Sequence, residues 1–456
     1  MNNRTNRSRP RTAAAIVGTV VAAVLIASCS SGSSSSTTTP TPNSSSTPTS
    51  GTGGSAAPGV SSTQISVGSI ASLTGAISAD FAAFVPGIRA YLDMVNAHGG
   101  VTNGGVTRKV VLTANLDDAG TSFNQLAHTL IQQDGVFAAF ISTFFFTPGL
   151  FVQTKTPTFG YNTSGNWTPD PNLFGAGGST QDYNYGAPSI AYLISQLHAK
   201  SVAVVSYGPA ISSSYDACHT SAQKLQAAGV NVAYTNLDES LGGDYTPAVQ
   251  RMQQAGVDFV WTCMQSSDNV TLARAIKQYG LNIHQLWFSG YDNALLSKYS
   301  DLMQNVYLGV NGDVPFQVTT AYPGKYPGMA QYLAAMKQYA PNDTYSDLAL
   351  QGWQSAALLV EGIRRAGNNL TQANVVNQIN QITNFTAGGV SNPINWTTAH
   401  DTTQQTFPIC SAYVKVKGTS FVPAVAKAPQ TFLCFEKSVD LKNPALATPP
   451  AGTPGT

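Results

Sequence analysis

The residue with the clearest chemistry in the sequence is Cys29. The first twelve residues contain four arginines and no acid, and a run of small and apolar residues follows at Ala13–Ala27. A positive start and a short apolar core are typical of a secretory signal, and a run of roughly 15 residues is shorter than the ~20 that a spanning helix needs. The run ends in Ile-Ala-Ser-Cys, which resembles a bacterial lipobox, where the thiol is acylated and cleavage makes the cysteine the new N-terminus.

We therefore expect residues 1–28 to be a lipoprotein signal peptide and Cys29 to carry the lipid. Two or three acyl chains on one residue anchor a protein stably, whereas a single chain binds a membrane only marginally. The mature protein would then be anchored to the cell membrane on its extracytoplasmic face. The alternative is an uncleaved N-terminal anchor with a chance cysteine at this position.

The other four cysteines predict disulfide bonds. An even number of cysteines in an exported chain favours pairing, and their spacing does not resemble a zinc motif. Four cysteines permit three pairings, of which we favour the two that are near in sequence. In the chain-entropy model each loop would contribute roughly 3.5 to 4 kcal/mol. The expected pairs are Cys218 with Cys263 and Cys410 with Cys434.

The sequence gives little support for catalysis or for nucleic-acid binding. Its six histidines are scattered without metal-ligand spacing, and no Gly-x-Ser-x-Gly elbow occurs. The run Gly175-Ala-Gly177-Gly178 does not match a dinucleotide fingerprint. Charged residues are 10% of the chain and the net charge is +1, without the basic stripe that nucleic acid requires. We expect no cofactor, no metal and no enzyme, although a catalytic triad can assemble from distant residues, so an envelope hydrolase stays open.

Composition divides the chain into a tether, a folded part and a tail. Residues 29–62 are rich in Ser, Thr, Pro and Gly with almost no large apolar residue, so this segment cannot form a core. It is predicted to be a disordered tether that lifts the folded part off the membrane. The tail at residues 443–456 has a similar composition and is predicted to be loose.

Between tether and tail, strand patterns alternate with helical patterns. Gln64–Ile70, Arg108–Ala114 and Val136–Ser142 are predicted strands, and apolar residues recur at helical spacing between them. A second series of such units begins near residue 181. Alternating units imply an α/β fold with parallel sheets covered by helices on both faces. We expect two doubly wound lobes joined by crossing strands.

The predicted lobes are each built from two parts of the chain. Lobe 1 comprises residues 63–180 plus about 307–400, and lobe 2 comprises residues 181–306 plus about 401–442. The late helix predicted at Tyr345–Ala366 comes after the second series is complete, so it should return to lobe 1. Ala412–Val416 and Phe421–Val425 are predicted to form a hairpin in lobe 2.

Several segments resemble a known family in their order and spacing. They are Ser72–Gly75, Gly87, Asn96–Val101, Asp117-Asp118, Asp244-Tyr245, Gln254–Asp258, Ala275 and Gly280-Leu281. Together, from Gln64 to about Pro423, the chain resembles the type I periplasmic solute-binding proteins, and most closely the leucine/isoleucine/valine-binding family of ABC importers. The resemblance implies a monomer that captures a small molecule between its lobes and delivers it to an importer permease.

The resemblance also implies where the ligand binds. In open α/β sheets, ligands lie beyond the carboxyl ends of the strands. The loops there contain Ser72, Thr74, Asp80, Thr143, Phe144, Tyr161, Asn162, Tyr207, Ser213, Gln265, Tyr291 and Asp292. Several of these residues have another possible role: Ser72 and Thr74 could cap the following helix, and Asp292 could be a helix cap.

The ligand class is open from the sequence. Amino-acid binders have Ser and Thr in the loop after the third strand, but here three phenylalanines, Phe144–Phe146, replace most of them. These rings either belong to the core or form an apolar wall of the cleft. With Tyr, Asn and Gln nearby, they suit an apolar or aromatic, amino-acid-like ligand. A ligand sensor that signals through a membrane partner would use the same cleft and is the main alternative to a transport receptor.

Overall fold

The computed structural model describes residues 57–162, 167, 170–178, 186–310, 313–401, 408–425 and 430–449. The predicted signal peptide, Cys29, most of the tether and the end of the tail lie outside these residues. In the part of the chain that is described, no helix has both the length and the apolar character needed to cross a membrane.

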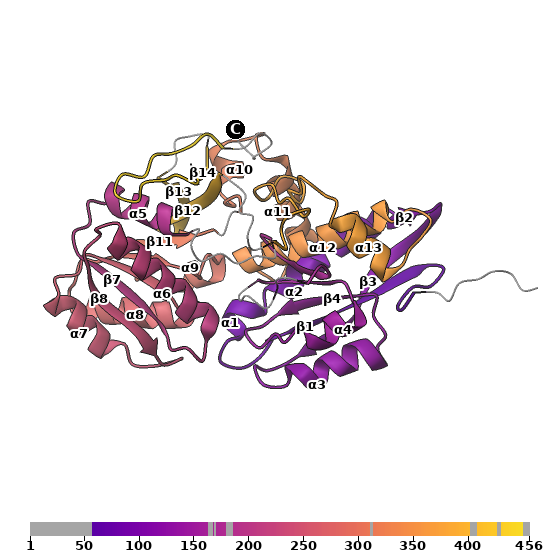
Figure 1. Ribbon diagram of the computed structural model, residues 1–456, viewed down its shortest axis with the longest axis horizontal. Helices are drawn as coiled ribbons and strands as arrows, with labels where there is room; N and C mark the ends of the chain where they lie inside the picture. Colours follow the sequence, from indigo (N-terminus) through magenta and orange to yellow (C-terminus); the bar gives the residue numbers. More distant parts are fainter. Residues whose placement is uncertain are drawn as a thin grey trace, which may run out of the picture. The chain divides into compact units, whose positions relative to one another are not determined.

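The first lobe is built on a six-stranded sheet in the order β2-β3-β1-β4-β5-β6 (Figure 1). All neighbouring strands are parallel except β2 and β3. The strands are β1 (Gln64–Ala71), β2 (Val101–Asn103), β3 (Val106–Asp117), β4 (Ala138–Ser142), β5 (Thr158–Gly160) and β6 (Leu173–Gly175). Its early helices are α1 (Ser78–Phe81), α2 (Phe84–Ala97), α3 (Phe123–His128), the π-helix η1 (Thr129–Gln133) and α4 (Gly149–Thr154).

Four late helices lie between residues 318 and 379, after five strands of the second lobe and before its last three: α10 (Val318–Ala321), α11 (Pro327–Tyr339), α12 (Asp347–Arg365) and α13 (Gln372–Ile379). Of these, α11 and α12 pack on α2 (Figure 1). The Ser346 side chain caps α12 by accepting a hydrogen bond from Ala349 N, and two arginines complement its last turn. The return of this helix to lobe 1 is confirmed.

Glycines allow α2 and α12 to approach closely. A Cβ at Gly87 would lie 1.8 Å from Ala349 O, and one at Gly352 would lie 2.0 Å from Phe84 O. Side chains at these two positions would separate the helices. The close contact ties the late part of the chain firmly to the first lobe.

The second lobe is built on a sheet in the order β13-β12-β11-β10-β9-β7-β8, with β14 paired to β12 (Figure 1). The strands from β7 to β11 are parallel, and β12 is antiparallel to its neighbours. The strands are β7 (Val202–Tyr207), β8 (Val232–Glu239), β9 (Phe259–Cys263), β10 (His284–Trp287), β11 (Val306–Gly309), β12 (Ile409–Lys417), β13 (Ser420–Ala424) and β14 (Phe432–Phe435). Its helices are α5 (Gly186–Gln196), α6 (Ser212–Ala227), α7 (Thr246–Gln254), α8 (Ser266–Gln278) and α9 (Asn293–Tyr299).

The predicted fold class, with two doubly wound lobes, is confirmed, and so is the hairpin of β12 and β13. The chain stays in the second sheet through β11, so it returns to lobe 1 after Gly309, slightly later than the expected boundary near 306. Two segments that cross between the lobes pair with each other, because Asp313 and Ser391 form an antiparallel bridge and Val314 N donates to Val390 O at 2.8 Å.

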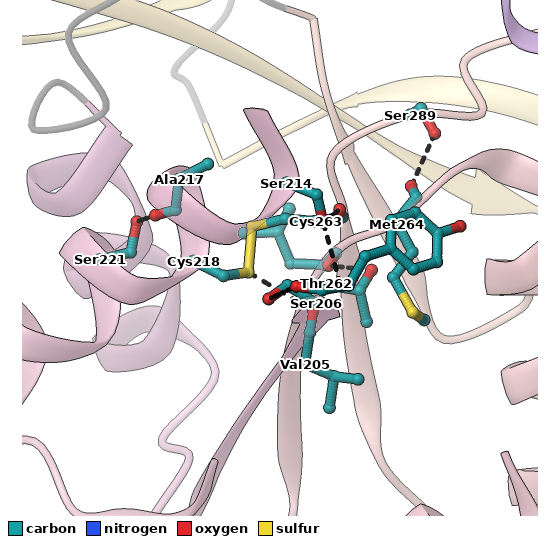
Figure 2. The surroundings of a disulfide bond; sticks show 12 residues. Val205, Ser206, Ser214, Ala217, Cys218, Ser221, Thr262, Cys263, Met264 and Ser289 are labelled. Carbon is teal, nitrogen blue, oxygen red and sulfur yellow. Dashed lines mark hydrogen bonds between the residues drawn. A yellow bond between two sulfur atoms is a disulfide. The ribbon is translucent and has the colours of Figure 1, made fainter. Parts of the chain in front are cut away.

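Both predicted disulfides are confirmed. Cys218 in α6 is bonded to Cys263 at the end of β9, as Figure 2 shows, and Cys410 in β12 is bonded to Cys434 in β14. The first bond ties a helix to the strand whose carboxyl end leads into α8.

Short segments at both ends of the folded part also make hydrogen bonds. Ser66 N donates to Gly59 O at 2.7 Å, and Val60 forms a bridge with Ile65, so pairing begins before β1. Near the other end, Ala447 N donates to Cys434 O at 2.7 Å. These contacts involve residues that the sequence assigned to the tether and the tail.

Candidate functional site

The loop after β1 is held within the first lobe by Asp117, the last residue of β3, and by Asp118, which follows it. Thr74 Oγ1 donates to Asp117 Oδ2 at 2.5 Å, and Ser72 Oγ donates to Asp118 Oδ1 at 2.6 Å. Thr143 Oγ1 lies 3.0 Å from Ser72 Oγ. Ser72 and Thr143 are buried and Thr74 is exposed. A ligand would have to compete with these carboxylates for the hydroxyl groups, and neither Ser72 nor Thr74 makes a side-chain cap for α1.

The three phenylalanines after β4 have different surroundings. Phe146 is buried and stacks on Trp167, with 4.5 Å between ring centroids, so it belongs to the core. Phe145 is 47% exposed. Phe144 is half-buried, and its ring lies edge-on to Phe81 of α1 at 4.5 Å. Phe144, which lies against the ring of α1, therefore suits the predicted apolar wall.

Tyr161 joins Phe144 around the same α1 ring. It is half-buried, and its ring centroid lies 5.8 Å from that of Phe81. Asn162 is buried and its Nδ2 donates to Gly178 O at 2.7 Å, which holds the loop after β6. Tyr161 can present an aromatic surface to a ligand, whereas the amide of Asn162 acts within the lobe.

The two lobes meet at the N-terminus of α8. Ser266 N, at the first residue of α8, donates to Asp80 Oδ2 of α1 at 2.8 Å. A carboxylate at a helix N-terminus is favoured by the free backbone N–H groups and by the helix dipole. Among the predicted site residues, Asp80 bonds the opposite lobe through its side chain, and so does Tyr291, whose Oη donates to Gln317 Oε1 at 2.6 Å and accepts from Phe316 N at 2.7 Å.

Behind this contact, a buried hydrogen-bond network fixes the start of α8. Tyr207 Oη donates to Asp268 Oδ2 at 2.5 Å and accepts from Gln265 N at 3.1 Å. Gln265 Nε2 also lies 3.3 Å from Asp268 Oδ2. Burial and the charge of Asp268 raise the pKa of Tyr207 far above its ordinary value. Tyr207 and Gln265 thus position α8, and the side-chain oxygen Oε1 of Gln265 accepts no hydrogen bond from the described residues.

The disulfide of Cys218 with Cys263 (Figure 2) is close to this network along the chain, because Cys263 is the last residue of β9. The Ser214 hydroxyl bonds Cys263 O and Tyr207 N, and Cys263 is only three residues before Ser266. Ser213, the predicted ligand residue, is half-buried in the first turn of α6. In this turn, the residue that bonds the network is its neighbour Ser214.

Tyr291 and Asp292 connect the second lobe to the start of α12. Tyr291 is buried, and its ring stacks on Phe316 at 4.4 Å. Its backbone oxygen accepts from Asp347 N at 3.0 Å, and Asp292 forms a bridge with Ser346. Asp292 Oδ1 accepts from Ala294 N and Leu295 N, which is the helix-cap role that the sequence left open.

Three carboxylates gather where α1, α9 and α12 begin. Burial, followed by the charges of Asp80 and Asp292, raises the pKa of Asp347 to about 8. Burial raises the pKa of Asp80 to about 6 against the Ser266 hydrogen bonds, and burial also raises the pKa of Asp292. None of the main influences on these three pKa values is a lysine or an arginine. Negative charge on these three carboxyl groups is therefore disfavoured, and a bound cation would stabilise their charged forms.

Sequence reasoning missed Asp347. Its position in the first turn of a helix makes it look like a residue that only complements the helix dipole. Two expectations from the sequence could have identified it. The helix that begins at Asp347 was expected to return to lobe 1, and carboxylates were already expected in the cleft at Asp80 and Asp292. We call Asp80, Asp292 and Asp347, together with Phe144 and Tyr161, the interlobe site.

A separate cavity of about 580 Å³ belongs to the first lobe alone. It lies among α2, α11, α12 and the 382–388 segment, and its lining includes Tyr91, Glu361, Arg364 and Phe385. None of the interlobe-site residues lines it. We place the candidate site between the lobes, because that is where two elements from different lobes bring charged groups together.

Solved structures show the same fold at low sequence identity. A fatty acid ABC transporter substrate-binding protein from Thermomonospora curvata aligns with a TM-score of 0.66 and 17% identity, covering 87% of this chain and 97% of that chain. A branched-chain amino acid ABC transporter protein from Thermus thermophilus with bound valine aligns with a TM-score of 0.64 and 18% identity, covering 82% and 97%. The isoleucine complex of LivJ from Streptococcus pneumoniae has a TM-score of 0.62 and 16% identity, covering 80% and 99%.

A search of the curated proteins found no match. The family model for periplasmic binding proteins, in contrast, matches residues 64–418, which span most of both lobes and all of the interlobe site. The resemblance seen in the sequence is confirmed by this match and by the shared fold. Proteins of this family bind solutes and are not enzymes. The chain belongs to the periplasmic binding protein family.

Proposed function

We propose that this protein is a lipid-anchored receptor that captures a small molecule between its lobes and delivers it to the permease of an ABC importer. The observation that carries the proposal is the interlobe contact of Asp80 with Ser266 at the carboxyl edges of two doubly wound sheets. Ligands bind at such edges, and closure of two lobes around them is a hinge motion. In this proposal Cys29 carries the lipid anchor, and the tether at residues 29–62 separates the folded part from the membrane.

We further propose that the ligand carries an ammonium group on an apolar or aromatic body. Asp80, Asp292 and Asp347 supply negative charge, and a cation among them would restore their ordinary pKa values. The rings of Phe144 and Tyr161 supply an apolar surface beside α1. An aromatic or aliphatic amine, including an amino acid with such a side chain, combines both features.

The test is a thermal-unfolding screen of the purified protein against amino acids, aliphatic and aromatic amines, sugars, nucleosides and carboxylic acids. A ligand that binds only the native state raises the unfolding midpoint by mass action. We expect stabilisation by at least one amine and none by carboxylic acids that lack an amine. If only neutral or anionic solutes stabilised the protein, the ammonium assignment would be wrong, and if no solute did so, capture itself would be in doubt.

The affinity for such a ligand should depend on pH. Because Asp80 and Asp347 are partly protonated at neutral pH in the free protein, an ammonium ligand must displace protons. Affinity should therefore rise from pH 5 to pH 8, and calorimetry in buffers of different ionisation enthalpy should show proton release. A neutral ligand would show neither effect.

Transport and sensing are separated by uptake. Deleting the gene from the host should abolish uptake of the ligand found in the screen if the protein serves an importer. A sensor that signals through a membrane partner would leave uptake unchanged and alter only the response to the ligand.

A further inference from the structure

The cavity of about 580 Å³ in the first lobe has no part in the proposed capture of a solute between the lobes. It is bounded by α2, α11, α12 and the segment at residues 382–388, and its volume is within the range of small-molecule sites. An α-helix rises about 1.5 Å per residue, so the end of α12 at this cavity lies roughly 25 Å from Asp347 at its beginning. A ligand in the cavity would therefore be separate from one in the interlobe site.

The charged groups in the lining of the cavity do not all form pairs. The lining contains two arginines, Arg364 and Arg365, and one glutamate, Glu361. Arg365 Nε donates to Glu361 Oε1 at 2.6 Å, which neutralises one of the two positive charges. In the part of the chain that the structure describes, Arg364 forms no ion pair. The lining therefore has a net positive charge, which resides on Arg364.

Tyr91 of α2 lies beside Arg364 in this lining. Its ring packs edge-on against Trp353 of α12, with 4.8 Å between the ring centroids, which fixes the direction of the side chain. Burial raises the pKa of Tyr91, and the positive charge of Arg364 opposes that rise, so the hydroxyl and the guanidinium are close to each other. A guanidinium only donates, and a tyrosine hydroxyl has one proton to donate. Together the two groups place N–H and O–H donors at one wall of the cavity.

Apolar side chains form another part of the lining. Met94 of α2 is half-buried, and Ile382 and Phe385 in the segment after α13 are largely buried. Small-molecule sites commonly combine such apolar surface with a few polar groups that fix the orientation of the ligand. The cavity therefore suits an anion attached to a carbon body.

We propose that this cavity binds a phosphate monoester with an apolar or aromatic body. The Arg364 guanidinium can donate through two parallel N–H groups to two oxygens of one anion, and the Tyr91 hydroxyl can donate to a third. A phosphate monoester has three free oxygens, whereas a phosphate diester and a carboxylate each have two. The proposal is independent of the proposed function, because none of the interlobe-site residues lines the cavity.

Both α2 and α12 end near this cavity, and the negative end of a helix dipole by itself disfavours an anion. That partial charge resides on the free carbonyl groups of the last turn. Here Val95 O accepts from Gly100 N, and Gly362 O accepts from Ala366 N. Because these carbonyl oxygens are already bonded, the full charge of Arg364 outweighs the partial charges of the helix ends.

The test is isothermal titration calorimetry of the purified protein with phenyl phosphate, inorganic phosphate, methyl phenyl phosphate and benzoate. Phenyl phosphate should bind with a dissociation constant below about 1 mM. Inorganic phosphate lacks the carbon body, methyl phenyl phosphate is a diester and benzoate is a carboxylate, so each should bind about tenfold more weakly or worse. Absence of binding at about 10 mM phenyl phosphate, or equal affinity for benzoate or for the diester, would overturn the proposal.

Two variants test whether the phosphate lies in the cavity. Arg364→Gln changes an exposed side chain, so the protein should fold, and phenyl phosphate should bind about tenfold or more weakly. Tyr91→Phe keeps the ring against Trp353 and removes only the hydroxyl, so binding should weaken about threefold to tenfold.

The matched control is Arg274→Gln, which changes an exposed arginine of α8 outside the cavity and should keep the wild-type affinity for phenyl phosphate. Unchanged affinity in both Arg364→Gln and Tyr91→Phe would place the ligand elsewhere and overturn the proposal. An equal loss of affinity in Arg274→Gln and Arg364→Gln would overturn it too, because the binding would then depend only on the overall charge of the protein.

Discussion

At the scale of single residues, the carboxylates of the interlobe site govern how the protein responds to pH. Asp80 bonds the opposite lobe through Ser266 N, and Asp347 lies beside it at the start of α12. Both groups are held in surroundings that disfavour their charged forms. Such perturbed groups are characteristic of sites built for a ligand.

Stability of the ligand-free protein should therefore fall as pH rises. The pKa values of about 6 for Asp80 and about 8 for Asp347 lie above the ordinary 3.8, so the native state binds more protons than the unfolded chain across this window. Their stabilising contribution is complete at acidic pH and is lost as pH rises through the folded-state values. We expect the unfolding midpoint to drop between pH 5 and pH 9, and to drop less in Asp347→Asn.

Asp216→Asn is the control for this measurement, because its carboxylate is exposed. It should reproduce the wild-type change in midpoint with pH. If Asp347→Asn lost as much stability between pH 5 and pH 9 as the wild type, Asp347 would not be a strongly perturbed group.

The role of single residues was harder to predict from the sequence than their position. Tyr207 ends β7 and Gln265 follows β9, as expected for this edge of the sheet, but their polar atoms hold α8 through Asp268. Asp292 caps α9. A sequence identifies which loop a polar residue occupies, whereas its partner depends on chain segments that only the folded structure brings together.

At the scale of elements, the contact of α2 with α12 holds the early and late parts of the first lobe together. The backbones approach so closely that Gly87 and Gly352 have no room for a Cβ. Helical spacing of apolar residues was enough to predict both helices, because periodicity reports one buried face. The partner of α12 could be inferred only from its late place in the chain, and the β6 strand of three residues was too short to give a pattern.

Gly352→Ala should destabilise the protein through this contact. The added methyl group would lie 2.0 Å from Phe84 O, so the two helices must shift apart, at a cost of about 1–3 kcal/mol. Chemical denaturation measures the change in the free energy of unfolding.

Gly149→Ala is the matched control for this substitution. Gly149 begins α4, and a Cβ there would meet nothing within 4 Å. Reduced freedom of the unfolded chain should make this change neutral or stabilising by up to ~1 kcal/mol. Equal free energies of unfolding in both variants would contradict the close packing of α2 on α12.

At the scale of the whole molecule, the proposed function joins a two-lobed binding protein to an anchor. Composition and alternation of elements predicted the two lobes, because a buried parallel sheet needs apolar strands and covering helices. The cysteine spacing favoured both disulfides that the structure contains. The interlobe site could be predicted only as a set of loops, since its geometry depends on how α1, α8 and α12 meet.

The anchor at Cys29 predicts lipid attachment. In the host, the wild-type protein should incorporate labelled fatty acid, and Cys29→Ser should not, because serine offers no thiol for acylation. The described pairing begins at Gly59, 30 residues after Cys29, so solute binding by the purified variant should be unchanged. Absence of label in the wild type, or equal label in Cys29→Ser, would contradict the proposed anchor.

The central claim, capture of an amine between the lobes, is tested most directly by a crystal structure of the protein bound to the ligand that stabilises it. We predict that the ligand nitrogen lies within about 3 Å of Asp80 or Asp347 carboxylate oxygens, with the ligand body against Phe144 and Tyr161. A ligand bound in the cavity between α2 and α12, or one that leaves all three carboxylates of the interlobe site without a contact, would contradict the account.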